Sequence, residues 1–440
     1  MSDKKYRRSL SLNERLSLAF SQQGSPMAYT VFIEGTGDIP DEAMEKAIRK
    51  LALLYPVLRS KISGCLKNLH WEESDNFPRF FRMETTTSPL GNWALEEEKA
   101  IFRKKMNLKK ESPFAVYTLT DGHKRRFYFK IHHSAIDGGA AYLLGHVLFT
   151  ILRGEEPLGP TEGPETKKEL YDITLPDDFF EQRMQKALKD KTLKPGTQEK
   201  EGGSKLFNGV YKGKHMISPP SKDNQAEWYA LFTPPDKVTL SNLNGKMISA
   251  VLEALKKLNP GLENKRFQSF VPVNLRYLMP ELIKAADLTG LIAIELDKYF
   301  NVPITERIAS INNDIKEQIK DGWAISKPLP ILDWIPIRLL TALIFIIRKI
   351  AFYRKTSPYY FYFSNIYTFE MSNFSTESFK ADRLFAITSL HICCPLSIIM
   401  STHDNGVELA CITDTDKKGL GEFVNVLKKE IASLEKELKT

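Results

Sequence analysis

Seven consecutive residues of this chain combine side chains that can move a proton to and from a reacting group. They are His132-His133-Ser134-Ala135-Ile136-Asp137-Gly138. An imidazole titrates near neutral pH, so one histidine can take a proton from an attacking hydroxyl or amine and later return it to a leaving group. The pattern therefore indicates a general base in a group-transfer reaction.

The flanking residues predict that this motif lies in a turn between a strand and a helix. Residues 125–131 alternate basic with aromatic or aliphatic side chains, which is typical of a strand, and apolar residues recur at helical spacing over 140–152. Adjacent residues of a strand point to opposite faces, so His132 and His133 cannot both enter one pocket. We predict that His133, nearer the turn, is the base, and that His132 faces inward and bonds to the backbone.

The other specified residues of the motif have positioning roles. Asp137 can pair with a distant arginine and hold the shape of the turn, while Gly138 and Gly139 let the chain bend and start the helix without a Cβ in the way. We therefore place His132, Asp137 and Gly138 at the site as structural residues.

Two other interpretations of the motif stay open. Histidine and aspartate are both metal ligands, but neither His123 nor His146 forms a metal-binding pattern with the pair, and we expect no metal. The two histidines could also be buried and structural, with satisfied hydrogen bonds. An aspartate and a glycine at these positions of a strand-to-helix turn favour catalysis over both.

Length and composition predict a globular enzyme of two lobes. A chain of 440 residues, 42% hydrophobic and 26% charged, can bury two substantial cores. Glycine, proline and lysine dominate the middle of the chain, which indicates a linker. We predict an N-terminal lobe over 1–185 that carries the histidine motif, a linker over 186–222 and a C-terminal lobe over 223–440.

Hydrophobic periodicity predicts several elements in each half. The expected strands are 27–35, 228–232, 267–276, 385–389, 396–401 and 407–412, and the expected helices are 41–54, 246–258 and 420–438.

Cysteine usage and charge bear on location and partners. The four cysteines, at 65, 393, 394 and 411, form no CxxC pair, which suits a reducing compartment, and no export signal follows the basic N-terminus, so we expect a cytoplasmic protein. The net charge is +8, and the basic clusters at 103–110, 123–126 and 184–214 lack nucleic-acid-binding motifs. We expect no nucleic-acid partner. The clusters could guide an acidic carrier protein or the phosphates of CoA, or be a solvated surface.

The segment 331–352 is the sequence feature that hints at a lipid-like substrate. It is apolar, but Asp333, Arg338, Arg348 and Lys349 interrupt or bound it, and a membrane span needs about 20 apolar residues. A buried helix on the sheet of the second lobe is the favoured interpretation. The alternative is a helix that lies at a membrane surface or lines an acyl-chain tunnel.

The histidine motif resembles the signature of the CoA-dependent acyltransferase superfamily, which includes chloramphenicol acetyltransferase, condensation domains, alcohol acetyltransferases and wax ester synthases. That signature is two histidines, three variable residues, Asp and Gly, and this chain matches all four specified positions. The resemblance implies an α/β fold of two chloramphenicol acetyltransferase-like lobes, each a mixed sheet flanked by helices, with the active-site tunnel between them. It also implies that His133 is the general base and that Asp137 forms a salt bridge with a remote arginine.

A second segment resembles the same superfamily. Residues 271–276 read Val-Pro-Val-Asn-Leu-Arg, similar to a strand that ends in Pro-Val-x-Leu-Arg and supplies the arginine that reaches the motif aspartate. A guanidinium can compensate a buried carboxylate with two parallel hydrogen bonds. We predict that Arg276 pairs with Asp137.

A third segment is an aromatic strand, 360–363, followed by Ser364 and Asn365. In wax ester synthase-like members a Ser-Asn pair at this point shapes the acceptor channel, which implies that one of the two helps to stabilise the oxyanion. Ser-Asn is also a common way to end a strand. The Pro-Gly expected after the pair is absent, as is the Asp-Phe-Gly-Trp-Gly signature of plant alcohol acyltransferases.

We expect an acyltransferase, acting on groups other than amino-acyl groups, that moves an acyl group from acyl-CoA or an acyl-phosphopantetheine to an alcohol or amine. The thioester is a co-substrate, and no bound cofactor is expected. Two alternatives stay open: a condensation-domain-like protein that joins carrier-bound substrates in lipid or natural-product biosynthesis, and a non-catalytic binding protein of the same fold. We expect a monomer with a possible acyl-carrier partner and peripheral membrane contact through 331–352.

Overall fold

The computed structural model describes residues 6–22, 27–65, 68–162, 227–264, 267–278, 283–321, 335–354, 361–389, 396–413 and 416–438, with the backbone alone given for 264, 347–354 and 367. The expected linker over 186–222 lies outside these residues, as do Cys393 and Cys394. The expected division of the chain into two lobes therefore stays a prediction as far as its boundaries are concerned.

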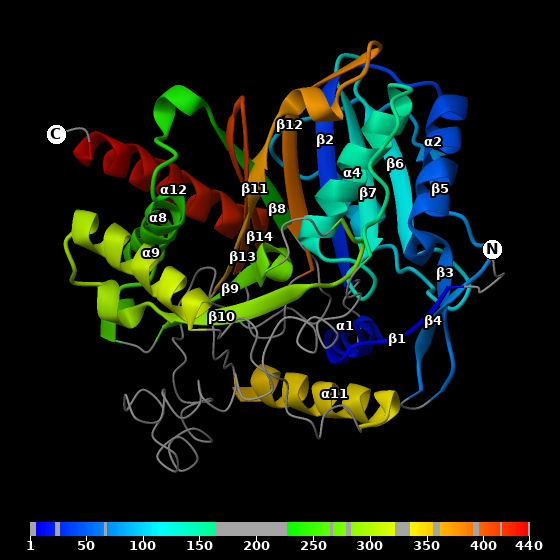
Figure 1. Ribbon diagram of the computed structural model, residues 1–440. Helices are drawn as coiled ribbons and strands as arrows, with labels where there is room; N and C mark the ends of the chain where they lie inside the picture. The colour runs from blue at the N-terminus through cyan, green and yellow to red at the C-terminus, as the bar shows by residue number, and fades with distance from the viewer. Residues whose placement is uncertain are drawn as a thin grey trace.

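The first lobe is built on a five-stranded sheet in the order β12-β2-β7-β6-β5. Only β5 and β6 are parallel; the other neighbours are antiparallel. Helices α2 and α4 cover one face of this sheet (Figure 1). Helix α3 lies against the other face, where Tyr128 of β7 donates to Glu98 of α3 at 2.8 Å. The elements are β2 (Ala28–Gly37), α2 (Asp41–Leu54), β5 (Arg79–Arg82), α3 (Glu96–Arg103), β6 (Phe114–Thr120), β7 (Arg125–His132), α4 (Gly138–Leu152) and β12 (Phe379–Thr388).

The second lobe is built on a six-stranded sheet in the order β10-β9-β11-β13-β14-β8. Strand β11 is parallel to both of its neighbours, whereas the remaining pairs are antiparallel. Helices α8, α9 and α12 pack together beside it (Figure 1). The elements are β8 (Glu227–Thr233), α8 (Leu243–Leu258), β9 (Gln268–Asn274), β10 (Thr289–Glu295), α9 (Ile304–Lys320), β11 (Phe361–Phe369), β13 (Leu396–His403), β14 (Gly406–Thr413) and α12 (Lys417–Glu437).

Three short strands form a separate sheet near the N-terminus in the order β1-β4-β3. Helix α1 follows β1 in the chain and packs against α11 at the edge of the molecule (Figure 1). The elements are β1 (Arg7–Ser9), α1 (Leu12–Gln22), β3 (Ser60–Ser63), β4 (His70–Glu73) and α11 (Ile337–Arg354).

Strand β12 crosses from the second half of the chain into the sheet of the first lobe. It pairs with β2 over its whole length, from Phe379 opposite Gly37 to Thr388 opposite Tyr29. It also contacts β13 and β14 of the other sheet, and Arg383 of β12 donates from Nε to Glu408 Oε1 of β14 at 2.6 Å. The second half of the chain therefore supplies one strand to the sheet of the first lobe, and this strand packs against the second sheet.

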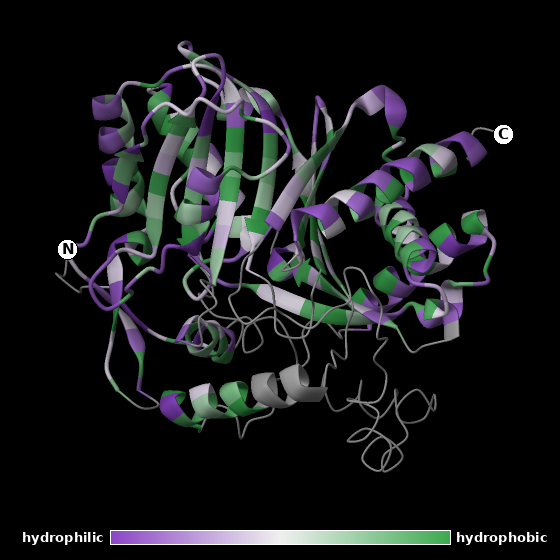
Figure 2. Ribbon diagram, turned by 180° about the vertical axis from the view of Figure 1, so that it is seen from behind, coloured by the Kyte–Doolittle hydropathy of each residue, from purple (hydrophilic) through white to green (hydrophobic). Residues whose placement is uncertain are grey.

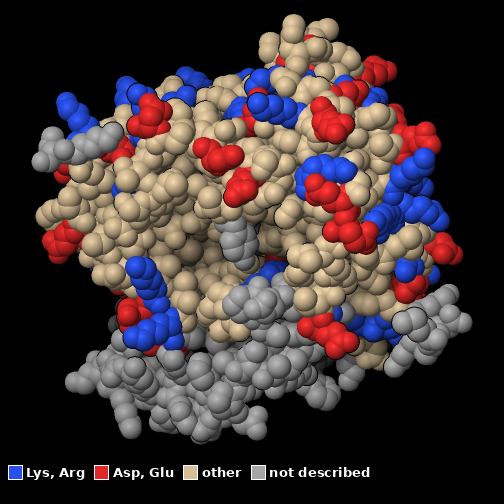
Figure 3. Space-filling model, turned by 45° about the horizontal axis from the view of Figure 1, so that its top comes forward, with Lys and Arg blue, Asp and Glu red and all other residues tan. Residues whose placement is uncertain are grey.

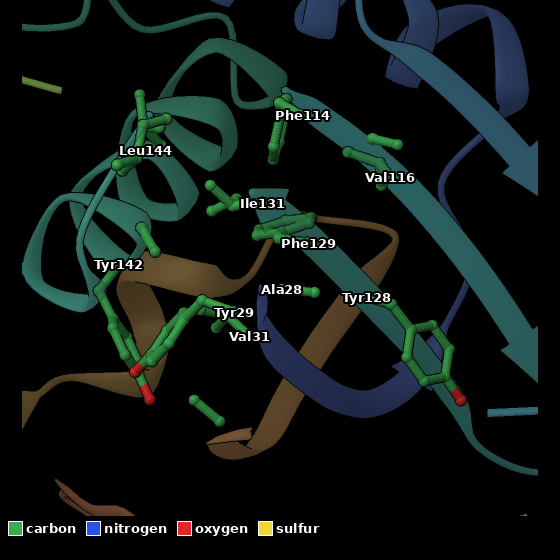
Figure 4. Close-up of a cluster of buried hydrophobic side chains, with 14 of the residues drawn as sticks. Ala28, Tyr29, Val31, Phe114, Val116, Tyr128, Phe129, Ile131, Tyr142 and Leu144 are labelled. Carbon is green, nitrogen blue, oxygen red and sulfur yellow. The ribbon is translucent and has the colours of Figure 1, made fainter. Parts of the chain in front are cut away.

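Alternating side chains explain how β7 and its neighbours build the core of the first lobe. Phe127, Phe129 and Ile131 of β7 are fully buried and point toward α4, and Figure 4 shows Phe129 and Ile131 packed with Phe114 and Leu144. Figure 2 shows green, hydrophobic residues concentrated on the strands, with purple residues on the outer faces of the helices. Burial of an aromatic or aliphatic side chain contributes about 1.5–3 kcal/mol, so the buried face of β7 stabilises the position of the strand.

Most sequence-predicted elements are present, and two differ. The helix expected over 41–54 is α2 with the same bounds, and 125–131 and 246–258 lie in β7 and α8. Ser364 and Asn365 do not end a strand, because β11 continues to Phe369 and stays paired with β13, with a register shift between Ile366 and Thr368. The helix expected to be buried on the second lobe's sheet is α11, which instead contacts α1 and leaves apolar residues exposed.

The described part of the chain contains no helix that is long and apolar enough to span a membrane. On the face shown in Figure 3, acidic and basic residues are intermixed, and a hollow near the middle is bordered mainly by uncharged residues. The positive net charge is thus not gathered into one patch on this face.

Candidate active site

The backbone of the histidine motif is anchored to the start of β2. Strand β7 ends at His132, and the His133 N–H donates to the carbonyl of Met27 at 2.8 Å. Met27 has a φ of 41°, a left-handed conformation that is uncommon for a residue with a side chain. The strained residue and the general-base candidate therefore share a hydrogen bond at the point where β2 and β7 end side by side.

The two histidines have different surroundings. His132 is fully buried; its Nδ1 accepts from the Ser134 N–H at 3.2 Å and lies 2.7 Å from Ser134 Oγ. Burial, with smaller contributions from the charges of His133 and Lys130, lowers the pKa of His132 to about 3, so it is neutral at pH 7. His133 is only partly buried and its ring lies edge-on to that of Tyr29, with centroids 6.2 Å apart.

The structure brings Asp137 and Arg276 together. Arg276 Nη1 lies 3.0 Å from Asp137 Oδ1 and 2.8 Å from Oδ2, and the guanidinium donates from Nη2 to the carbonyls of Lys284 and Ala286. The carboxylate also accepts from the Leu288 N–H at 2.7 Å. These contacts satisfy both charges in a buried place, which is the condition under which such a pair is tolerated.

Asp137 is at the same time the N-cap of α4. Its Oδ1 accepts from the Ala140 N–H at 2.8 Å, and its own backbone is extended, as N-cap residues are. One carboxylate thus starts the helix that follows the motif and links it to the second lobe through Arg276.

Gly138 and Gly139 are placed where a side chain would collide with the site. A Cβ on Gly138 would lie 3.0 Å from the Tyr29 ring, and one on Gly139 would lie 3.0 Å from Asn274 Nδ2. The glycines therefore allow close approach of the helix N-terminus to β2 and β9.

A cavity of about 90 Å³ lies between the two sheets and includes His133 in its lining. Both lobes contribute: β2, the motif turn and β12 from the first, and β9, β10, β11 and β13 from the second. The lining residues are Tyr29, His133, Gly138, Gly139, Pro272, Asn274, Thr289, Tyr362, Ser364, Asn365, Ile366, Thr388 and Ile399.

Ser364 and Asn365 both border the cavity but differ in orientation. Ser364 is buried and lies on the same face of β11 as Tyr362 and Ile366, which also line the cavity. Asn365 is exposed, and its Nδ2 donates to Asn244 Oδ1 at 2.7 Å. Of the two, Ser364 is the side chain better placed to reach a group beside His133.

Sequence patterns did not indicate Asp287, a second buried carboxylate at the site. It lies between Ala286 and Leu288, the residues whose backbone contacts Arg276 and Asp137, and its Oδ1 accepts from the Thr289 N–H at 3.4 Å. Burial raises the pKa of Asp287 to about 6; His133 opposes this shift, while Asp137 and Glu14 add to it. No motif precedes Asp287, and only its tertiary position reveals it.

Three further cavity residues, Tyr29, Asn274 and Thr289, were also not expected at the site. Asn274 stands inside the Pro-Val-x-Leu-Arg-like segment at its variable position, and its Oδ1 accepts from both the backbone and the Nη1 of Arg276. The variable position carries no signal for Asn274, and Tyr29 and Thr289 likewise lie in strands without one. Within the described ranges, no group of three or more His, Cys, Asp or Glu residues is arranged to hold a metal ion.

Comparison with solved structures finds this architecture in condensation domains. The condensation domain of the monacolin K polyketide synthase MokA superposes with a TM-score of 0.63 and 10% identity, covering 98% of this chain and 97% of that one. Polyketide synthase associated protein 5 from Mycobacterium tuberculosis gives 0.65 and 13%, covering 98% of each chain.

The chain has the condensation-domain fold. A further match is the starter condensation domain of the rhizomide synthetase RzmA in complex with C8-CoA and Leu-SNAC, with a TM-score of 0.66, 13% identity and coverage of 98% and 94%. No protein-family profile and no curated protein sequence matches the chain. The α/β fold of two sheet-containing lobes expected from the histidine motif is confirmed.

Proposed function

We propose that this protein is an acyltransferase that moves an acyl group from a thioester to a hydroxyl or amine, with His133 as the general base. The observation that carries the proposal is the position of His133 on the cavity between the two sheets, next to a turn that Asp137 and Arg276 hold in place. A partly buried imidazole on a cavity of this kind can meet a substrate, which the fully buried His132 cannot.

The chain's own residues account for the proton transfers. His133 takes the proton of the acceptor's O–H or N–H as the new C–O or C–N bond forms at the thioester carbonyl. The C–S bond then breaks, and the imidazolium returns the proton to the departing thiolate. No acyl-enzyme is needed, because the acceptor attacks directly from the cavity.

Ser364 is our candidate for stabilising the oxyanion. Its placement on the cavity side of β11 lets a hydroxyl donate to a carbonyl oxygen beside His133, and such a donor contributes most when it is already oriented. Asn365 is the weaker candidate, since its amide is engaged by Asn244 at the surface.

A donor carried on phosphopantetheine is the second candidate. The solved structures of the same fold include condensation domains of polyketide and peptide synthetases, one of them crystallised with C8-CoA and with C8-CoA plus Leu-SNAC. Acyl-CoA and an acyl-carrier protein present the same thioester to His133, so the reaction is shared and the delivery differs. A non-catalytic protein of this fold would bind such thioesters without turnover.

Thiol release with a panel of acyl-CoAs, in the presence and absence of alcohols and amines, tests the proposal. We expect acceptor-dependent release that His133→Ala abolishes. Release that is equally fast in the variant would contradict general-base catalysis by His133, and release that occurs only with acyl-carrier proteins would favour the condensation-like alternative.

We also propose that α11 contacts a membrane surface, which suits a lipid-like acyl substrate. Leu339, Leu343 and Ile346 lie on one side of the helix and are 60%, 41% and 53% exposed. No acidic residue occurs from 334 to 369, whereas Arg338 lies beside this apolar face. Apolar residues with cationic neighbours fit the interface of an anionic bilayer.

Flotation with phosphatidylcholine vesicles, with and without phosphatidylserine, tests this contact. Leu343→Ser combined with Ile346→Ser should reduce binding to the anionic vesicles, while Leu53→Ser, at another exposed leucine (55%), should not. Self-association that the double variant disrupts, seen by light scattering, would overturn both the membrane contact and the expected monomer.

A further inference from the structure

A second concave site lies in the first lobe, apart from the cavity that contains His133. It has a volume of about 140 Å³. It lies on β5, β6 and β7, on the face of the sheet that α2 and α4 do not cover. The two cavities share no lining residue. The cationic lining residues come from β5, β7 and the segment that follows α3.

The lining of this site is strongly cationic. It contains five basic side chains and one carboxylate, that of Glu111, which accepts from the backbone N–H of Asn107 at 3.0 Å. The five are Arg79, Lys104, Lys105, Lys110 and Lys130. Within the part of the chain that the structure describes, none of these five forms an ion pair. Other basic residues of this lobe do so, among them Arg82, Lys124, Arg125 and Arg126.

Lys130 anchors the backbone at the C-terminal end of α3. Its ammonium is buried and donates to the carbonyls of Ile101, Phe102 and Lys104, which are the free acceptors at the C-terminal end of α3. Burial, with the charge of Lys104 as a smaller cause, lowers the pKa of Lys130 to about 7. The backbone that carries Lys104 and Lys105 is therefore held at a fixed place over the sheet.

Aromatic side chains form the floor. Phe81 of β5 stacks on Tyr117 of β6 with centroids 4.7 Å apart and planes 18° apart. Lys104 Nζ lies 5.0 Å from the Phe81 centroid, within the range of a cation–π contact. Phe77 and Met106 add apolar surface at the rim.

We propose that this site binds a small phosphate monoester, with the phosphate between Lys104, Lys105, Lys110 and Arg79 and the ester's apolar body against Phe77 and Met106. A phosphate monoester carries nearly two negative charges at pH 7, more than a carboxylate, and can meet several lysines at once. The concave shape and small volume fit such a group and exclude a folded acidic protein.

Titration calorimetry with phenyl phosphate, AMP and benzoate, on the full chain at low and moderate salt, tests the proposal. We expect the two phosphates to bind more tightly than benzoate and to lose affinity with salt. Lys104→Gln with Lys110→Gln should weaken phosphate binding about tenfold or more. Lys46→Gln, at a lysine whose side chain is 75% exposed on α2, serves as the control and should leave it unchanged.

The outcomes separate this site from the acyl-transfer proposal. The double variant should retain the wild-type kcat for thiol release at saturating acyl-CoA, because neither of its residues lines the cavity of His133. The absence of phosphate binding, equal binding by the double variant and the control, or equal affinity for benzoate would each overturn the proposal. Binding to phosphatidic acid vesicles without binding to phenyl phosphate or AMP would overturn it in favour of a membrane headgroup surface.

Discussion

Asp137 and Arg276, separated by 139 residues in the chain, meet with 2.8 Å between Asp137 Oδ2 and Arg276 Nη1. The carboxylate belongs to the motif turn of the first lobe, and the guanidinium belongs to the 3-10 turn Leu275–Leu278 that follows β9 in the second. This ion pair therefore couples the position of His133 to the packing of the two lobes.

Asp137→Asn should destabilise the protein by about 3–5 kcal/mol, because it leaves the buried Arg276 without a counter-charge. Urea unfolding followed by fluorescence measures the loss. Glu42→Gln removes one partner of the exposed Glu42–Lys46 pair and should leave the free energy of unfolding essentially unchanged, because solvent screens such a pair. Equal effects of the two substitutions would argue against a stabilising role of the buried pair.

His133→Ala should lower kcat for acyl transfer by about 10²–10⁴-fold while the free energy of unfolding changes little, since the ring is partly exposed on the cavity. Thiol release measures turnover, and circular dichroism checks the fold. His132→Ala is the informative contrast: its ring is fully buried against Ser134, so we expect a loss of stability. A His133 variant with near wild-type turnover would remove the general base from the mechanism.

Ser364→Ala should reduce kcat by about 10²-fold if its hydroxyl donates to the oxyanion, with little change in KM. Asn365→Ala is its matched control on the same strand, because the Asn365 amide is held by Asn244. If the two variants lose equal activity, or if only Asn365→Ala is impaired, the assignment of the oxyanion donor is wrong.

Asp287→Asn should alter how stability depends on pH. The pKa of Asp287 is raised from 3.8 to about 6 in the folded protein, so the folded state holds this proton more tightly than the unfolded chain. The stability that results is fully present below about pH 4 and is lost as pH rises through about 6, with a span of about 2–3 kcal/mol. Unfolding free energies at several pH values should show the variant gaining on the wild type as pH rises across this window. Parallel curves would show that Asp287 does not titrate in this way.

Local patterns were enough to predict the motif turn but not its partner. The alternation in β7 and the helical spacing in α4 follow from residues that are close in sequence, and Arg276 stands at the end of a recognisable strand. The pairing of Arg276 with Asp137 was expected from the resemblance to a superfamily, since no local rule joins residues so far apart.

Features that depend on tertiary contacts could not be predicted from local sequence patterns. Asp287 has no pattern of its own and becomes part of the site only because its loop packs on Arg276. The Ser-Asn pair was open to interpretation as a strand end, but pairing of Ile366 and Thr368 with β13 carries β11 onward. The apolar run of α11 suited a buried helix, and only the fold shows that Leu339, Leu343 and Ile346 on its outer face are exposed.

Strand β12 has a consequence for the way the protein can be divided and opened. Without it, β2 would become a free edge strand with unpaired backbone groups along ten residues, which invites association with other chains. A fragment that ends before 379 would therefore leave the edge of β2 exposed and prone to association. A C-terminal fragment that contains β12, supplied in trans, would be needed to cover that edge. The same strand packs on the sheet of the second lobe, so wide separation of the lobes would break the contacts of β12 with β13 and β14, including the one between Arg383 and Glu408.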